Sequence, residues 1–132
     1  MTIHNLGSKT TAFQLQSSAV ISATAAGQVG GAAAFLDTQQ YEGDIVVSLD
    51  HAAAGSGVTL TAKIQESDSS GSGYTDVAGG AFTAAAANTA GFASLTLPGD
   101  TLKRYIRAQF TVTGGSGTGA ACIIGRASTK YL

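Results

Sequence analysis

The segment Lys103–Thr113, KRYIRAQFTVT, carries the clearest structural signal in this chain. Apolar side chains at positions 106, 108, 110 and 112 alternate with polar or amphipathic side chains. Successive side chains of a β-strand point to opposite faces, so this period of two predicts a strand with one face in a core. The glycine-rich stretch 114–119 separates it from a second apolar run, Ala120–Ile124. We therefore expect 103–113 and 120–124 to form a β-hairpin with a flexible tip.

The same alternation recurs along the chain between glycine-rich breaks. It is clean in Asp44–His51, where positions 45, 47 and 49 share one face, and in 58–66. Only the short loop 52–57 separates these two segments, and its three alanines cannot nucleate a helix. The two strands are therefore expected to pair antiparallel. Further candidate strands lie at 13–17 with a continuation over 20–24, and at 32–36, 74–77, 81–83 and 91–97.

Short strands with frequent turn signals predict an all-β fold, a jelly-roll or related antiparallel β-sandwich. The chain has 132 residues, enough for one domain to bury a core without disulfides. Residues 1–12 show little periodicity and are expected to form an extended N-terminal arm, with 13–132 as a single β-sandwich domain. Residues 1–6 lack the order expected of a signal peptide, and no run of 18 apolar residues predicts a membrane span.

The composition is unusually poor in charge. Charged residues make up 11% of the chain, against about a quarter in ordinary soluble domains. A surface of small uncharged residues suits a protein packed against neighbours, and a secreted low-charge module is the alternative. The net charge is −1, and the one basic cluster, Lys103, Arg104 and Arg107, is too small to predict direct nucleic-acid binding.

Residue types used in catalysis and metal binding are sparse. Cys122 is the only cysteine, which fits maturation in a reducing cytoplasm, and its apolar surroundings predict a buried, inert thiol. His51 ends a strand and is expected to face solvent, and with His4 it does not give the ligand spacing of a zinc site. Asp68 and Asp76 flank a Ser/Gly loop that lacks the ligand pattern of a calcium loop.

Three glycine–serine stretches superficially suggest reactive or phosphate-binding loops. The stretches 55–57 and 71–73 lack the spacing and following helix of a nucleophile elbow. The stretch 115–119 leads into a predicted strand, whereas a phosphate cradle leads into a helix N-terminus. We therefore expect a protein that is not an enzyme and that uses no cofactor and no metal.

Several motifs between Ile45 and Tyr131 resemble those of a group of tailed-bacteriophage virion proteins. They are IQESD at 64–68, a Gly/Ser loop, YTDV at 74–77, Leu97-Pro98 and KRYIR at 103–107, followed by an alternating strand and a glycine-rich tip. These features are similar to capsid cement, or decoration, proteins with a jelly-roll fold. The motifs are structural, and the N-terminal arm and the alanine-rich stretches 52–54 and 84–87 are matched less well.

The resemblance implies a structural role on the virion. Such proteins are made in the host cytoplasm, bind the outside of the major capsid protein shell and stabilise the expanded head. Their partners would be the major capsid protein and further copies of the same chain, as a homodimer or homotrimer, with no nucleic acid or membrane. A tail, neck or head-fibre component and a glycan- or receptor-binding module are the alternatives.

Candidate contact residues come from two regions of the sequence. The polar face of the 103–113 strand would meet capsid carboxylates, and apolar residues of the arm would lie in grooves. The proposed capsid or subunit contacts are Ile3, Leu6, Phe13, Lys103, Arg104, Tyr105 and Arg107.

Overall fold

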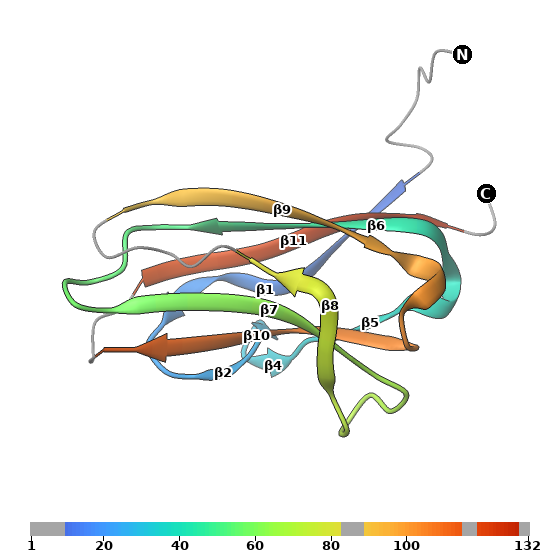
Figure 1. Cartoon of the computed structure of the whole chain (residues 1–132), viewed down its shortest axis with the longest axis horizontal. Helices are drawn as coiled ribbons and strands as arrows, with labels where there is room; N and C mark the ends of the chain where they lie inside the picture. The colour runs from blue at the N-terminus through green and yellow to red at the C-terminus, as the bar shows by residue number, and fades with distance from the viewer. Residues whose placement is uncertain (1–9, 83–88, 115–118, 130–132) are drawn as a thin grey trace, which may run out of the picture.

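In a computed structural model, which describes residues 10–82, 89–114 and 119–129, the chain forms a sandwich of two antiparallel sheets (Figure 1). Sheet A has the strand order β1-β11-β6-β9, and sheet B has the order β2-β10-β7-β8, with β5 also pairing with β10. The predicted all-β class, a jelly-roll or related antiparallel β-sandwich, is confirmed. The strands of sheet A are β1 Thr10–Ile21, β6 Tyr41–His51, β9 Gly91–Pro98 and β11 Gly119–Thr129.

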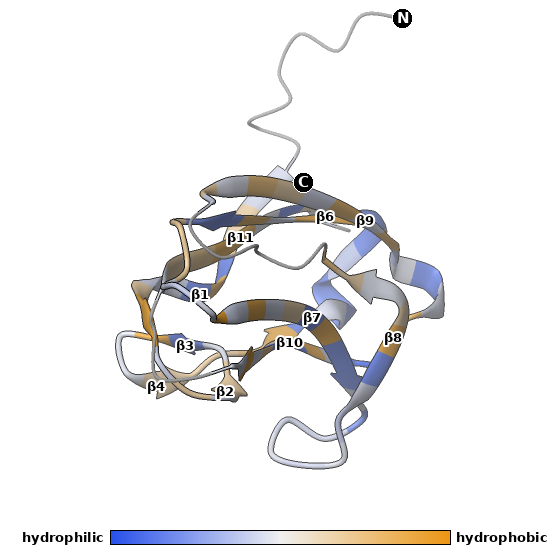
Figure 2. Ribbon diagram, turned by 60° about the vertical axis from the view of Figure 1, so that its left-hand side comes forward, coloured by the Kyte–Doolittle hydropathy of each residue, from blue (hydrophilic) through white to orange (hydrophobic). Residues whose placement is uncertain are grey.

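Sheet B and the connecting elements complete the fold. Figure 2 shows the two sheets as separate layers, with β8 running along one side of the sandwich from sheet B toward sheet A. The strands of sheet B are β2 Ala25–Ala26, β5 Leu36–Asp37, β7 Thr59–Ser67, β8 Thr75–Ala81 and β10 Tyr105–Thr113. The remaining elements are the small hairpin of β3 Gln28–Val29 and β4 Ala32–Ala33 and the 3-10 turns η1 Thr38–Gln40 and η2 Gly99–Thr101.

The core lies between the sheets, on the faces that the alternation predicted. Ile106, Ala108 and Phe110 of β10 are fully buried, as are the side chains at 45, 47 and 49 of β6 and at 60, 62 and 64 of β7. The intervening positions of all three strands face outward and are half-buried or exposed. The period of two therefore identified both the strands and their inner faces correctly.

Both predicted hairpins are wrong, because each loop crosses from one sheet to the other. β10 pairs with β7 in sheet B, whereas β11 pairs with β1 and β6 in sheet A. Likewise β6 belongs to sheet A and β7 to sheet B. The loop between β6 and β7 places Ala54 and Val58 in buried positions, so its apolar residues close the end of the sandwich. Burial of these side chains favours the crossing over a solvent-exposed hairpin turn.

Four smaller differences concern element ends. β1 begins at Thr10, so residues 10–12 of the predicted arm pair with β11, while residues 1–9 lie outside the described part of the chain. The predicted strand 32–36 divides into β4 and the start of β5. The predicted segments 13–17 and 20–24 fall in one strand, β1, which ends at Ile21, and the predicted strands 74–77 and 81–83 fall in one strand, β8, which ends at Ala81. Thr83 and the stretch 84–87 lie outside the described residues. Within the described ranges, no helix is long and apolar enough to cross a membrane.

The predicted environments of Cys122 and His51 are both wrong. On β11 the odd-numbered positions from 119 to 127 are buried, so Cys122 lies on the outer face and is half-exposed. On β6 the inward phase continues to the last residue, so the His51 ring is buried beside Gly91, and its Nδ1 lies 3.2 Å from the carbonyl oxygen of Ala52. In both cases the phase of the strand determines burial, whereas the apolar or terminal setting in sequence does not.

Candidate functional site

The outer face of sheet B carries a chain of side-chain hydrogen bonds across three strands. The Arg107 guanidinium of β10 donates from Nε and Nη2 to Oε1 of Gln65, at 3.1 and 2.9 Å. Gln65 of β7 donates from Nε2 to Oδ1 of Asp76 on β8 at 2.9 Å, and Lys63 Nζ donates to Oδ2 of Asp76 at 2.8 Å. The strand register explains this geometry, because Arg107 lies opposite Gln65 and Gln65 lies opposite Asp76.

Two tyrosine rings lie against the arginines of this face, and a phenylalanine ring lies against one of them. The guanidinium carbon of Arg107 is 4.2 Å from the ring centroid of Tyr74, and that of Arg104 is 5.0 Å from the ring of Tyr105. The exposed Phe35 ring meets Tyr105 edge-on, with centroids 5.5 Å apart. Both arginine positions allow cation–π attraction. We call these five residues, Phe35, Tyr74, Arg104, Tyr105 and Arg107, the Tyr–Arg surface.

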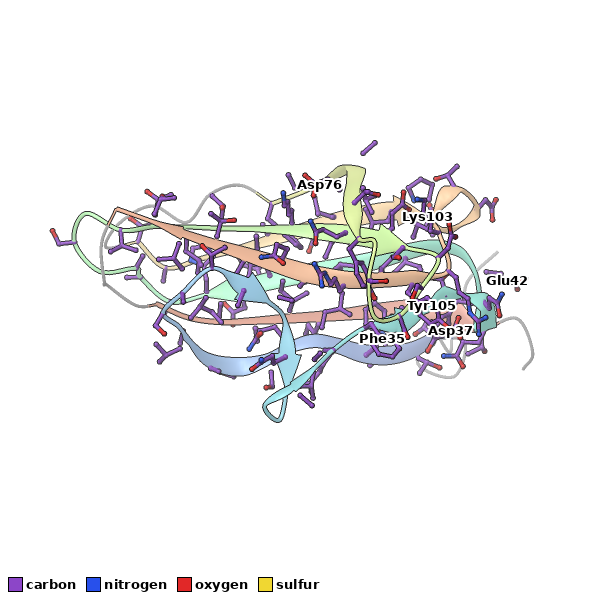
Figure 3. The ribbon with its side chains drawn as sticks, turned by 90° about the horizontal axis from the view of Figure 1, so that it is seen from below. Phe35, Asp37, Glu42, Asp76, Lys103 and Tyr105 are labelled. Atoms are coloured by element: carbon purple, nitrogen blue, oxygen red, sulfur yellow. The ribbon has the colours of Figure 1, made fainter. Side chains whose placement is uncertain are left out.

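The Tyr–Arg surface extends to one end of the sandwich. Figure 3 shows Phe35, Asp37, Lys103 and Tyr105 gathered at that end, with Asp76 farther along the sheet. Arg104 Nη2 lies 3.0 Å from Oδ2 of Asp37, which places an ion pair beside the aromatic rings. The two strands meet here because Tyr105 of β10 lies opposite Asp37 of β5.

The carboxylates of this face are held in their charged form by their neighbours. The hydrogen bond from Arg104 lowers the pKa of Asp37 below its ordinary value. The side-chain amide of Gln65, and then the Lys63 ammonium, lower the pKa of Asp76 in the same way. Both ion pairs are open to solvent, so each stabilises the fold only slightly. Their effect is to fix the positions of the side chains rather than to hold the sheet together.

Tyr74 anchors the loop side of the surface. Its hydroxyl donates to the carbonyl oxygen of Ser70 at 3.0 Å. Burial raises the pKa of this hydroxyl, and the nearby positive charge of Arg107 opposes the increase. Arg107 is held by an amide oxygen and an aromatic ring, and among the described residues it has no carboxylate partner. Its positive charge therefore remains available to a partner molecule.

The structure brings together four of the seven predicted contact residues, places Phe13 on the other sheet and does not describe Ile3 and Leu6. Arg104, Tyr105 and Arg107 belong to the Tyr–Arg surface, and the exposed Lys103 adjoins it, with its backbone N–H donating to Oε2 of Glu66 at 2.9 Å. Phe13 lies in β1 of sheet A, partly buried, with its ring over Gly125. Ile3 and Leu6 lie outside the described residues, so their role stays a prediction.

The sequence patterns missed Phe35, Tyr74 and Gln65 as members of this face. Gln65 and Tyr74 stand in the IQESD and YTDV motifs, but nothing in either motif says that they lie beside Arg107. The pairing of 58–66 with 103–113 would have placed them there. That pairing was hidden because both strands were assigned to hairpins with their neighbours in sequence.

The side chains that could bind a metal ion do not lie close together. Asp76 is engaged by Gln65 and Lys63, while Asp68 is exposed in the loop before β8. Within 10–82, 89–114 and 119–129, no three His, Cys, Asp or Glu side chains lie close enough to hold a metal ion. The arrangement that the described residues do offer is the Tyr–Arg surface, which combines tyrosine, arginine and phenylalanine side chains.

Comparisons with known proteins give a likeness of fold. No protein-family model matches the chain, and no curated protein sequence matches it. The structure titled as that of infectious bursal disease virus, Gx strain, matches with a TM-score of 0.52 at 12% identity, over 94% of this chain and 33% of that one. The VP2 subviral particle of infectious bursal disease virus gives a TM-score of 0.48 at 11% identity, over 92% of this chain and 33% of that one. This chain thus spans 33% of the length of each of these two chains. The first match shows that it shares its sandwich fold with part of a chain from a virus structure.

Proposed function

We propose that this protein is a structural virion protein, and specifically a capsid cement protein. In this role it binds the outside of the major capsid protein shell and stabilises the head. The observation that carries the proposal is the convergence of three separate motifs on one surface. IQESD, YTDV and KRYIR, which carry the resemblance to cement proteins, supply Gln65, Tyr74, Asp76, Arg104, Tyr105 and Arg107.

The chemistry of the Tyr–Arg surface suits a protein interface. Tyrosine and arginine are enriched among the residues that dominate binding energy, because they combine large contact area with directed polar groups. Here Arg107 is already oriented by Gln65 and Tyr74, so little side-chain freedom is lost on docking. The low charge of the whole chain limits the cost of desolvating the surrounding surface.

Repetition on a closed shell adds to the affinity of each contact. A standard specific interface buries about 1,600 Å² in total. A homo-oligomer that engages several capsomers at once gains avidity beyond the affinity of a single contact. The shared sandwich fold with part of a chain from a virus structure is compatible with this role, although it supports the fold alone.

The direct test is decoration of purified, undecorated tailed-phage heads, imaged by cryo-electron microscopy. The parent protein is expected to give ordered density between capsomers over the whole lattice. A Tyr105→Ala, Arg107→Ala double variant is expected to lower the occupancy at least tenfold at limiting protein concentration, because two anchor residues are removed. The matched control is Gln109→Ala, Thr111→Ala, two positions on the same outer face of β10.

Each alternative gives a different result in this experiment. A tail, neck or head-fibre component would appear in few copies at one vertex. A glycan- or receptor-binding module would leave the heads bare and bind a defined glycan on an array. Decoration by the double variant that equals decoration by the parent would remove the Tyr–Arg surface from the proposal.

A further inference from the structure

The outer face of sheet A exposes large apolar side chains on all four of its strands. Val20 of β1 is 61% exposed, Val46 of β6 is 42%, Phe92 of β9 is 68% and Ile124 of β11 is 47%. Among the described residues, the other large apolar side chain exposed to this extent is Phe35, near sheet B. The inward faces of the same strands are occupied by the core, and the described residues leave these four side chains exposed.

A groove of about 650 Å³ opens on this face between β1 and β6. Ala12, Val46, Ser48, Ile124 and Arg126 contribute to its wall, which is largely apolar. Phe92, the most exposed of the four apolar side chains, lies on β9 at the other side of the same face. One face thus carries both an apolar hollow and an apolar projection.

A hollow and a projection on one face are complementary to those of a second copy. A two-fold axis that lies in the plane of the face, midway between the groove and Phe92 and perpendicular to the line joining them, exchanges the groove with Phe92. The partner's Phe92 then enters this groove while Phe92 of this chain enters the partner's groove. Such a contact is isologous and closes after two copies.

Two charged side chains of opposite sign, Arg126 and Asp50, also lie on this face. Arg126 lines the groove and donates to Oγ1 of Thr10 at 2.9 Å, but it makes no ion pair among the described residues. Asp50 lies opposite Phe92 in the β6–β9 register and likewise has no ion pair there. The two-fold axis that exchanges groove and projection therefore brings Arg126 toward the Asp50 end of the partner's face.

The size of the face is sufficient for a stable contact. Four strands about 4.8 Å apart, with a rise of about 3.3 Å per residue, give a face of about 20 by 30 Å, on the order of 600 Å² in projection. A standard interface buries about 800 Å² of accessible surface on each partner. Because side chains roughen the surface, the accessible area exceeds the projected area and approaches that value.

We propose that the outer face of sheet A is a two-fold interface with a second copy of this chain, in which Phe92 of each copy fills the groove beside Val46 and Ile124 of the other. This inference does not rest on the proposed function, because it uses the sheet opposite the Tyr–Arg surface. It also selects the homodimer from the two oligomeric states that the sequence left open.

The test is sedimentation equilibrium of the full chain. The parent is expected to be a dimer, and Phe92→Ala is expected to raise the dimer dissociation constant at least tenfold. Phe92 is exposed, so the variant should retain its fold, which circular dichroism checks. The matched control is Phe35→Ala, which removes the exposed phenylalanine near sheet B and should leave the dimer intact.

A charge exchange tests the geometry independently of Phe92. Arg126→Asp and Asp50→Arg are each expected to raise the dissociation constant, and the double variant is expected to restore it to within threefold of the parent. Failure of the double variant to restore association would overturn the proposed two-fold arrangement.

Other occupants of the groove give distinct outcomes. A parent protein that is monomeric at 100-fold the concentration used for decoration, or that is a trimer, would overturn the proposal. A monomer that dimerises only after removal of residues 1–9 would assign the groove to that segment and would equally overturn it. The decoration experiment on sheet B variants is unaffected by any of these outcomes, so the two proposals fail separately.

Discussion

The two outer faces of this sandwich are built by the same alternation but differ in what they present. On sheet B, Arg107, Gln65 and Asp76 are joined by hydrogen bonds, and aromatic rings lie against the arginines. On sheet A, the outward positions carry Val46, Ile124 and other apolar side chains around a groove. On sheet B the polar and charged side chains are held by one another, whereas on sheet A the described residues leave the outward apolar side chains exposed.

This difference underlies the two contacts proposed above, one on each face. Oriented tyrosine and arginine side chains give specificity toward a partner of different sequence, since their hydrogen bonds are directional. An apolar face with a hollow and a projection suits a permanent contact between identical chains, in which area rather than charge provides the affinity. The proposed cement role would use both, with one face joining copies of the chain and the other recognising the shell.

The largest expected effect comes from the core on which both faces depend. Phe110 of β10 is 1% exposed and packs between the sheets, so Phe110→Ala is expected to lower the free energy of unfolding by about 3–5 kcal/mol. Thr111→Ala, at the adjacent outward position, is the control and should change it by no more than about 0.5 kcal/mol. Both values are measured by urea unfolding, and equal losses in the two variants would contradict the assigned phase of β10.

The inward phase of β10 was available from the sequence, and so were the inward phases of β6 and β7. A period of two needs only the order of side chains along one strand, and Ile106, Ala108 and Phe110 give it directly. The outward positions of Tyr105 and Arg107, two members of the Tyr–Arg surface, followed from the same pattern.

The assignment of strands to sheets was not available, since alternation along a strand says nothing about its partner. A short glycine-rich loop fits both a hairpin and a crossing between sheets. What separates the two here is tertiary: Ala54 and Val58 are buried at the end of the sandwich, and a side chain on Gly114 would meet the carbonyl oxygen of Gly57. The backbones at Gly57 and Gly114 therefore lie close together, although they are far apart in sequence.

A second, smaller effect on stability is expected at the contact between Gly125 and Phe13 in sheet A. Gly125 of β11 leaves room for the Phe13 ring, and a Cβ there would overlap the ring and lie 2.7 Å from the carbonyl oxygen of Val46. Gly125→Ala is therefore expected to cost about 1–3 kcal/mol of unfolding free energy. A Phe13→Ala substitution in the same chain should cost less in the Gly125→Ala background than in the parent, because the overlap with the ring is then already relieved.

The outcome of that double-variant comparison also locates the Phe13 side chain. Additive losses would mean that the ring does not lie over Gly125, and Phe13 would return to the set of residues available for contact with a partner. Strong coupling would keep Phe13 inside the sandwich and leave the apolar part of the predicted arm to residues 1–9.

The smallest expected effect is a pH dependence confined to sheet B. Hydrogen bonds from Gln65 and Lys63 lower the pKa of Asp76 in the folded protein below its ordinary value of 3.8. The stabilisation that these contacts give the folded protein is therefore fully present above about pH 4, and it is lost as the pH falls through the pKa of Asp76 in the folded protein. Asp76→Asn should be less stable than the parent at pH 6, and the difference should shrink as the pH approaches 2.5, as measured by urea unfolding at each pH. Asp68→Asn removes an exposed carboxylate from the loop before β8 and is the control at pH 6, where it should change the free energy of unfolding by no more than about 0.5 kcal/mol. A constant gap between the parent and Asp76→Asn across this range would mean that the Gln65–Asp76–Lys63 contacts do not form in solution.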